Sequence, residues 1–193
     1  MKIAIMQPNF IPWRGFFELA KSVDKFVFLD NVQFSKNSWH NRNRLLLKDG
    51  SVFTWTLPLE NHKSTCDFRM INVNKQAIKI KKIENLFQQN FSKSKNYFVL
   101  EKILGVIKNT KFTNLAEINT QILTIIFKHF NILTKVYNGS EMGLRSYDRT
   151  ERILEICYLL GGKEYITTAG AANYLSEDRF EERFGGRLTF MDY

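Results

Sequence analysis

The sequence has only two cysteines and no long hydrophobic run, and both shortages restrict its class. Cys66 and Cys157 lie far apart, and Cys157 falls on the apolar face of an expected helix, so we expect a core thiol rather than a disulfide. No apolar run approaches the roughly 20 residues of a membrane helix, and the apolar start of the chain meets Pro8 too early for a signal-peptide core. The sequence therefore predicts a cytoplasmic protein without a membrane span.

Signatures of metal and dinucleotide binding are also missing. The three histidines, His40, His62 and His129, do not have metal-ligand spacing, and neither cysteine forms a Cys-x-x-Cys or Cys-x-x-His pair. We therefore predict no metal site. No Gly-x-Gly-x-x-Gly or Walker A run occurs, so the motifs give no support to a dinucleotide site or a P-loop.

Positive charge is in excess, with a formal net charge of +9 and a pI of about 9.5. Such a charge favours an anionic partner: nucleic acid, an anionic membrane surface or a phosphorylated small molecule. Much of the excess is lysine spread between Lys75 and Lys111, which a solvated basic face also explains. The hydrophobic and charged fractions, 44% and 24%, are those of a folded globular domain.

The order of hydrophobic patterns predicts an α/β fold with a parallel, Rossmann-like sheet. Residues 2–6 indicate a strand, a helix should begin near Arg14 or Gly15, and residues 26–30 indicate a second buried strand. A strand, a crossover helix and a strand form a βαβ unit, in which ligands bind beyond the carboxyl ends of the strands. The turn at 49–50 predicts a hairpin.

The middle of the chain is mainly helical. Residues 75–130 predict about three helices, which would be a helical insertion or subdomain within a single α/β domain of residues 1–193. Asp148 should cap a further helix that ends at Leu160, before two glycines. After it we expect a strand, a short helix and a terminal strand, at residues 163–167, 170–175 and 188–191.

A loop suited to ligands follows the first predicted strand. Two prolines fix its φ angles, a glycine permits close backbone approach, and the following helix would offer free N–H groups to a phosphate or carboxylate. The alternative is a stiff loop that caps the sheet, with Trp13 and Phe16 in the core. The candidate binding residues of this loop are Gln7, Pro12, Trp13 and Gly15.

A second loop, residues 30–44, is denser in polar and cationic side chains. Its arginines could fork onto phosphates while a tryptophan stacks on a planar base or sugar face. Alternatively, Trp39 and Arg42 simply pack together. Asp30 and His40 are the candidates for a general base. The candidate binding residues are Gln33, Lys36, Trp39, Asn41, Arg42, Asn43 and Arg44.

These two loops resemble the WbqC-like family. Its Gln-Pro-x-x-x-Pro-Trp-x-Gly-Phe/Tyr-Phe pattern is matched by Gln7 through Phe17. Its Asp-x-Val-Gln-Phe/Tyr-Ser-Lys-x-x-Trp-x-Asn-Arg-Asn-Arg pattern is matched by Asp30 through Arg44. The resemblance covers essentially the whole chain. Members are associated with O-antigen gene clusters and some are described as candidate glycine transferases, so the resemblance implies an enzyme of lipopolysaccharide biosynthesis that aminoacylates an amino sugar.

The chain is similar, more faintly, to pantothenate synthetase. The strand and loop from Phe26 to Phe34 correspond to that enzyme's strand and Asn-Pro-x-Gln-Phe loop, and Trp13 to Phe16 correspond to its His-x-Gly-His. This likeness implies a nucleotidyltransferase-like fold and makes ATP a candidate cofactor. Both histidines of that motif are aromatic residues in this chain, and they contact nucleotide phosphates in the enzyme, so the likeness bears on the fold more than on adenylation.

The leading hypothesis is a transferase or ligase that joins an amino acid such as glycine, or an acyl group, to the amine of a nucleotide-linked amino sugar. Arg42, Arg44 and Lys36 would bind phosphate or carboxylate, and Trp13 or Trp39 would be the stacking wall. Gln7, Asn41 and Asn43 would orient the substrate. The alternatives are a tRNA-binding or other nucleic-acid-binding module, and a noncatalytic component of a polysaccharide assembly complex.

Overall fold

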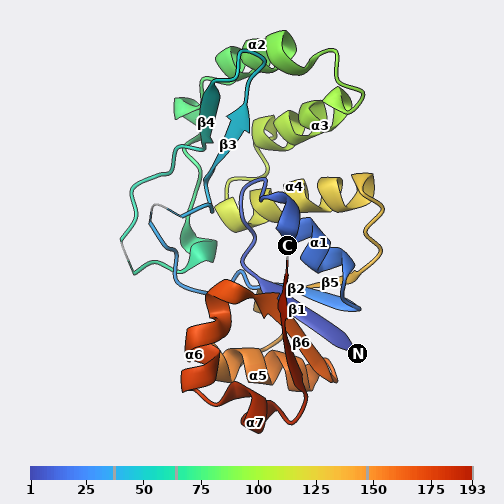
Figure 1. Cartoon of the computed structure of the whole chain (residues 1–193). Coiled ribbons are helices and arrows are strands. Elements are labelled where there is room, and N and C mark those ends of the chain that lie inside the picture. The colour runs from blue at the N-terminus through green and yellow to red at the C-terminus, as the bar shows by residue number, and fades with distance from the viewer. Residues whose placement is uncertain (37, 64, 147, 193) are drawn as a thin grey trace. The chain divides into compact units, whose positions relative to one another are not determined.

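The computed structural model describes residues 1–36, 38–63, 65–146 and 148–192 (Figure 1). The chain divides into two compact units. Unit 1 consists of Met1–Gln7, Trp13–Asp30 and Ile132–Tyr193, and unit 2 consists of Pro8–Pro12 and Asn31–Asn131. The single α/β domain with a helical subdomain at 75–130 stays a prediction.

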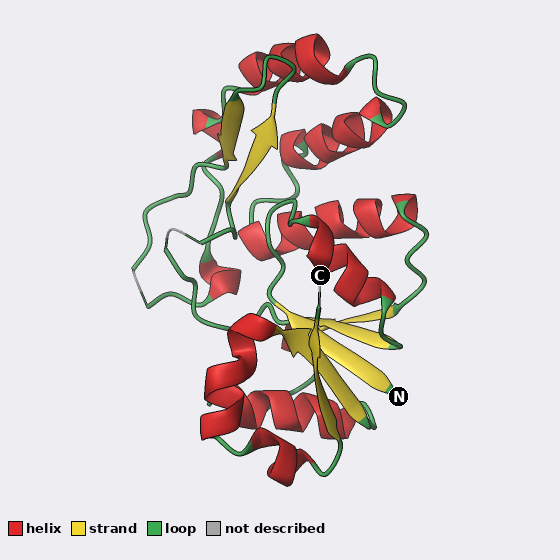
Figure 2. Cartoon of the chain, in the orientation of Figure 1, coloured by secondary structure: helices red, strands yellow, loops and turns green. Residues whose placement is uncertain are grey.

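Unit 1 is built on a parallel sheet of five strands (Figure 2). The strands are β1 (Lys2–Met6), β2 (Lys25–Phe28), β5 (Lys135–Asn138), β6 (Glu164–Thr168) and β7 (Arg187–Met191). They lie in the order β5-β2-β1-β6-β7, and all four neighbouring pairs are parallel. The α/β class with a parallel sheet is therefore confirmed.

Helices cover both faces of this sheet (Figure 1). Ile3 and Ile5 of β1 point to the same face, because alternate residues of a strand do so. Both belong to a buried cluster with residues of α5 (Arg149–Leu159). On the other face, Phe26 of β2 contacts Phe16 of α1 (Arg14–Lys21) with ring centroids 5.3 Å apart. The chain starts at the central β1, extends the sheet through β2 and β5, and then returns to β6 on the other side of β1. The sheet is therefore doubly wound.

Helix α5 begins and ends where the sequence predicts. The Asp148 side chain accepts hydrogen bonds from the N–H groups of Thr150 and Glu151, at 2.9 and 3.1 Å, and Gly161 follows the helix with a φ of 67°. Cys157 on this helix is fully buried, and burial raises the pKa of its thiol to about 12. The prediction of a core thiol at this position is confirmed. Two short helices complete unit 1: α6 (Ala172–Glu177) and α7 (Phe180–Phe184).

Unit 2 combines an antiparallel hairpin with three helices. The hairpin consists of β3 (Arg42–Leu46) and β4 (Val52–Thr56), and the predicted turn between them is confirmed, with Gly50 at a φ of 81°. The helices are α2 (Ile80–Phe91), α3 (Tyr97–Lys108) and α4 (Leu115–His129). No helix of the described residues is long and apolar enough to cross a membrane.

Candidate functional site

In unit 2, the buried amide of Asn119 joins the first motif loop to the second. Its Nδ2 group donates hydrogen bonds to the carbonyl oxygens of Pro8 and His40, both at 2.7 Å. The N–H of Phe10 in turn donates to the carbonyl oxygen of Trp39 at 3.0 Å. The side chain of Asn119 has no exposed surface, so these bonds form in an environment that excludes water. The Pro8–Pro12 and Asn31–Arg44 parts of the two motifs therefore lie side by side.

Asn43 fixes the strained turn of the first loop. Its Nδ2 group donates to the carbonyl oxygens of Phe10, at 3.3 Å, and of Ile11. Ile11 has a φ of 47°, in the left-handed region, where a β-branched residue is strained. Because such a conformation persists only where its surroundings hold it, the contact with Asn43 maintains the shape of the loop.

Asn41 has a comparable structural contact. Its Nδ2 group donates to the carbonyl oxygen of Leu57 at 2.9 Å, and its own carbonyl accepts from the N–H of Leu57 at 2.7 Å. The amide groups of Asn41 and Asn43 are therefore bound to the backbone of unit 2. Their predicted role in orienting a substrate stays a prediction, and any such role would be added to this structural one.

His40 lies among aromatic rings. It is 2% exposed, and its ring stacks on Phe68 at a centroid distance of 4.7 Å, with Phe34 at 5.5 Å. Burial lowers the pKa of His40 from 6.5 to about 4, because the charged imidazolium is poorly solvated there. The imidazole is therefore neutral at pH 7, and its conjugate acid is stronger than that of an ordinary histidine.

Trp39 and two arginines form a cationic and aromatic group, in which Trp39 and Arg44 are exposed and Arg42 is half-buried. Trp39 is 47% exposed, and the guanidinium carbons of Arg42 and Arg44 lie 5.9 and 5.7 Å from its ring centroid. Each such contact is worth roughly 0.5–1 kcal/mol at an exposed site. Arg42 and Arg44 are two residues apart on β3, so both point to the same face of the hairpin. Their guanidinium groups can bind phosphate beside a ring that can stack on a base or a sugar face.

The remaining predicted residues of unit 2 have different surroundings. Lys36 is exposed, whereas Pro12 is buried. Gln33 is exposed and forms an isolated β-bridge with Asp67, which fixes the backbone at the start of the second motif. Of these three, Lys36 is therefore the residue whose charge and exposure suit an anionic ligand.

In unit 1, the predicted residues follow the carboxyl ends of β1 and β2. Gln7 comes directly after β1, Trp13 is the residue before α1, and Gly15 is buried in the first turn of that helix. Asp30 follows β2 and is 9% exposed. Its carboxylate accepts hydrogen bonds from the N–H of Ser140, at 2.8 Å, and from the Ser140 hydroxyl, at 2.6 Å.

The topology of unit 1 adds a region that sequence reasoning did not select. In a doubly wound sheet, ligands bind beyond the carboxyl ends of the strands where the strand order reverses, here between β1 and β6. The pairing of these two strands is confined to Lys2 and Ile3 of β1, so their carboxyl halves are not joined by the ladder. Thr168, Ala169 and Gly170, which follow β6, therefore join Gln7 as candidates. Within the described ranges, no group of three or more His, Cys, Asp or Glu side chains could hold a metal ion.

Comparison with known proteins gives a match over nearly the whole chain. A model of the WbqC-like protein family matches residues 7–193. The chain is also similar to the protein named "Uncharacterized protein Rv1507c" of Mycobacterium tuberculosis (strain ATCC 25618 / H37Rv), with 28% identity over 197 residues. That alignment covers 100% of this chain and 82% of the relative. No solved structure gives a significant match.

Proposed function

From the premise that this chain belongs to the WbqC-like protein family, we propose that it forms an amide between an acyl donor and the amine of a nucleotide-linked amino sugar. Membership of the family fits a role in polysaccharide biosynthesis. The acyl group is that of an amino acid such as glycine. The sugar substrate has two recognisable parts, a planar base and a diphosphate.

The observation that carries the proposal is the group formed by Trp39, Arg42 and Arg44. A nucleotide sugar presents a flat ring and two adjacent phosphates, and this group offers an exposed indole and two guanidinium forks on one face of a hairpin. A guanidinium can hold two phosphate oxygens at once, whereas an ammonium acts as a point charge. Lys36 adds a further exposed cation in the same motif.

The proposed reaction joins the amine to an activated acyl donor, such as a thioester, an acyl adenylate or an aminoacyl-tRNA. The neutral amine nitrogen attacks the acyl carbonyl carbon, the new C–N bond forms, and the bond from that carbon to its leaving group breaks. The amine loses a proton to a base. Asp30 and His40 are the candidates for this base. ATP is the candidate activator where the donor is a free amino acid.

Ligand-induced thermal stabilisation tests the binding step, since a ligand that binds only the native state raises stability by mass action. A nucleotide-linked amino sugar should raise the melting temperature of the wild-type chain. Arg42→Ala should abolish this shift while leaving the ligand-free melting temperature nearly unchanged, and Arg42→Lys should restore it poorly. Lys81→Ala, an exposed lysine of α2, is the control that removes one charge elsewhere in unit 2. An unchanged ligand shift in Arg42→Ala would contradict the assignment.

The +9 net charge supports nucleic-acid binding as a second candidate function. The salt dependence of binding distinguishes these two candidate functions. Binding of a labelled RNA through phosphate contacts should weaken steeply between low and moderate salt and depend little on sequence. A nucleotide sugar held by a stacked ring should instead depend on the identity of its base and sugar. Tight, steeply salt-dependent RNA binding without any nucleotide-sugar shift would favour the second candidate.

A further inference from the structure

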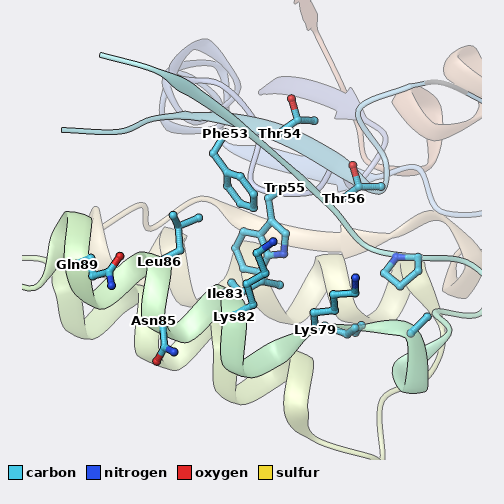
Figure 3. A pocket seen from close by; sticks show the side chains of 13 residues that line it. Phe53, Thr54, Trp55, Thr56, Lys79, Lys82, Ile83, Asn85, Leu86 and Gln89 are labelled. Atoms are coloured by element: carbon cyan, nitrogen blue, oxygen red, sulfur yellow. The ribbon is translucent and has the colours of Figure 1, made fainter. Parts of the chain in front are cut away.

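A pocket of about 890 Å³ lies within unit 2, between strand β4 and helix α2 (Figure 3). Cavities of this size accommodate small molecules of moderate length. All of its lining residues lie outside the two sequence motifs, although β4 pairs with the motif strand β3. The proposed function does not use this pocket. The pocket therefore needs an explanation of its own.

The inner walls of this pocket are apolar. Figure 3 shows Phe53 and Trp55 pointing from β4 toward the helix, and Leu86 pointing from α2 toward the hairpin. Thr54 and Thr56 point away, as strand alternation requires. A ligand that fills this space gains stability mainly by taking its own hydrocarbon surface out of water.

The charged side chains of the pocket have one sign. Figure 3 shows Lys79 and Lys82 extending from the start of α2 toward the hairpin, and none of the described lining residues is acidic. Within the described residues, neither ammonium group has an ion-pair partner. The nearby Glu84 is instead paired with Lys108, at 2.8 Å. Two ammonium groups at an apolar pocket favour a ligand that carries negative charge.

Trp55 contributes a hydrogen-bond donor without a partner. Its side chain is 1% exposed, and within the described residues its Nε1 group has no hydrogen-bond acceptor. Phe10 and Phe87 contact the indole ring edge-on, each at a centroid distance of 4.9 Å, and supply no acceptor. A buried indole N–H normally has a partner, and an orphan is costly. The indole forms part of the pocket wall, and because its Nε1 atom has almost no exposed surface, a ligand acceptor reaches it from the pocket when the ring shifts on binding.

We propose that this pocket binds an amphipathic anion, with an alkyl body against Phe53, Trp55 and Leu86 and a carboxylate or phosphate head that accepts from the Trp55 indole N–H and pairs with Lys79 and Lys82. The apolar walls select the body, and the two ammonium groups with the indole donor select the head. Free alkyl carboxylates and alkyl phosphates share this chemistry, so the experiment compares both.

The test follows the three tryptophan indole N–H signals of the ¹⁵N-labelled full chain by NMR. The signal of Trp55 is assigned through side-chain correlations and by its loss in Trp55→Phe. Octanoate, octyl phosphate and octanol are added below the concentrations at which they form micelles. Octanol has the same alkyl body without the charge. Octanoate or octyl phosphate should shift the Trp55 signal in a saturable way, and the signals of Trp13 and Trp39 should move little.

Charge-removing variants complete the test. Lys79→Met combined with Lys82→Met should weaken binding of the better anion at least about tenfold, because charge-assisted contacts are lost, while octanol binding should not weaken. Lys81→Met, an exposed neighbour on the same helix that does not line the pocket, should change affinity no more than about twofold. A preference for either head group supports the proposal and identifies the head. No saturable shift of Trp55 with either anion, or octanol binding as tight as both anions, would overturn it.

Discussion

Arg42 and Arg44 lie on one face of the β3–β4 hairpin, opposite Thr56 and Thr54, whereas Asn43 lies on the other face, opposite the buried Trp55. The two faces have different surroundings. Toward the core, Asn43 is bound to the backbone of the first motif loop. On the other face, the two guanidinium groups lie over the ring of the exposed Trp39.

One run of polar residues therefore makes two kinds of contact. Residues 41–44 are alternately asparagine and arginine, and they match the period of two with which a strand presents its side chains. The asparagines hold backbone carbonyls, while the guanidinium groups of the two arginines lie over the ring of Trp39. Mutations that act on the core side should therefore reduce stability, and mutations on the other face should reduce binding.

The largest expected effect concerns Asn119, a residue of α4 that donates hydrogen bonds to the backbone of both motif loops. Asn119→Leu removes the donors to the carbonyl oxygens of Pro8 and His40, which are both buried residues. We expect a loss of about 4 kcal/mol in the free energy of unfolding, measured by urea denaturation, since each unsatisfied buried group costs roughly 1–3 kcal/mol. Gln121→Ala, an exposed change on the same helix, should cost less than about 0.5 kcal/mol. Similar losses in the two variants would contradict this role of Asn119.

His40 makes the free energy of unfolding depend on pH. Its pKa is about 4 in the folded chain, against the 6.5 of an ordinary histidine in the unfolded chain. Between these values the unfolded chain binds more protons, so stability is complete above about pH 6.5 and falls as the pH drops toward 4. The expected loss is about 1.4 kcal/mol per pH unit, or about 3 kcal/mol in total.

Urea denaturation at pH 7 and pH 4.5 measures this loss. His40→Phe should flatten the dependence over this window, because the titrating group is removed from the aromatic surroundings. His129→Gln, at the end of α4, should leave the dependence largely in place. An equally steep fall in His40→Phe would show that another group causes it.

Sequence reasoning predicted most of the elements of unit 1 because they carry strong local signals. The buried run of β1 and the capped helix α5 are examples. It missed β5, a four-residue edge strand in which only Val136 and Tyr137 are apolar, and whose pairing with β2 joins residues more than 100 positions apart. It also missed α7, although Phe180 and Phe184 have helical spacing, because five residues give a weak periodic signal.

The candidate residues could be selected from the sequence, but the contact that each one makes could not. The motif runs selected residues 30–44 as candidates, yet the separation of Asn43 from Arg44 depends on the strand register, which no local pattern fixes beyond its period. Asn119 was missed, although it falls on the apolar stripe of α4 beside Ile118 and Ile122, where a polar residue signals a buried hydrogen bond. The region Thr168–Gly170 could be selected only from the strand order of the sheet.

A smaller loss should follow from Asn43→Ala. The change removes the donor to the carbonyl oxygens of Phe10 and Ile11 and the acceptor for the N–H of Arg44. We expect the free energy of unfolding to fall by about 1–2 kcal/mol. Protease susceptibility of the 8–12 loop should rise as well, because Ile11 loses the contact that holds its left-handed conformation. Unchanged stability together with lost ligand binding would instead give Asn43 a binding role.

The smallest effect on stability should come from Arg44→Ala, one residue further along β3. The Arg44 side chain is exposed, and its contact with Trp39 is worth at most about 1 kcal/mol, so we expect a stability loss of no more than about 1 kcal/mol. Binding of a nucleotide-linked sugar, measured by calorimetry, should weaken about tenfold or more, since a charge-assisted contact to phosphate contributes roughly 1.5–3 kcal/mol. Arg44→Lys separates the two causes of that loss: if charge alone matters, it should restore most of the affinity, and if the planar fork matters, it should restore little. Arg44→Ala with lower stability and unchanged affinity would place Arg44 with the structural residues and remove the distinction between the two faces.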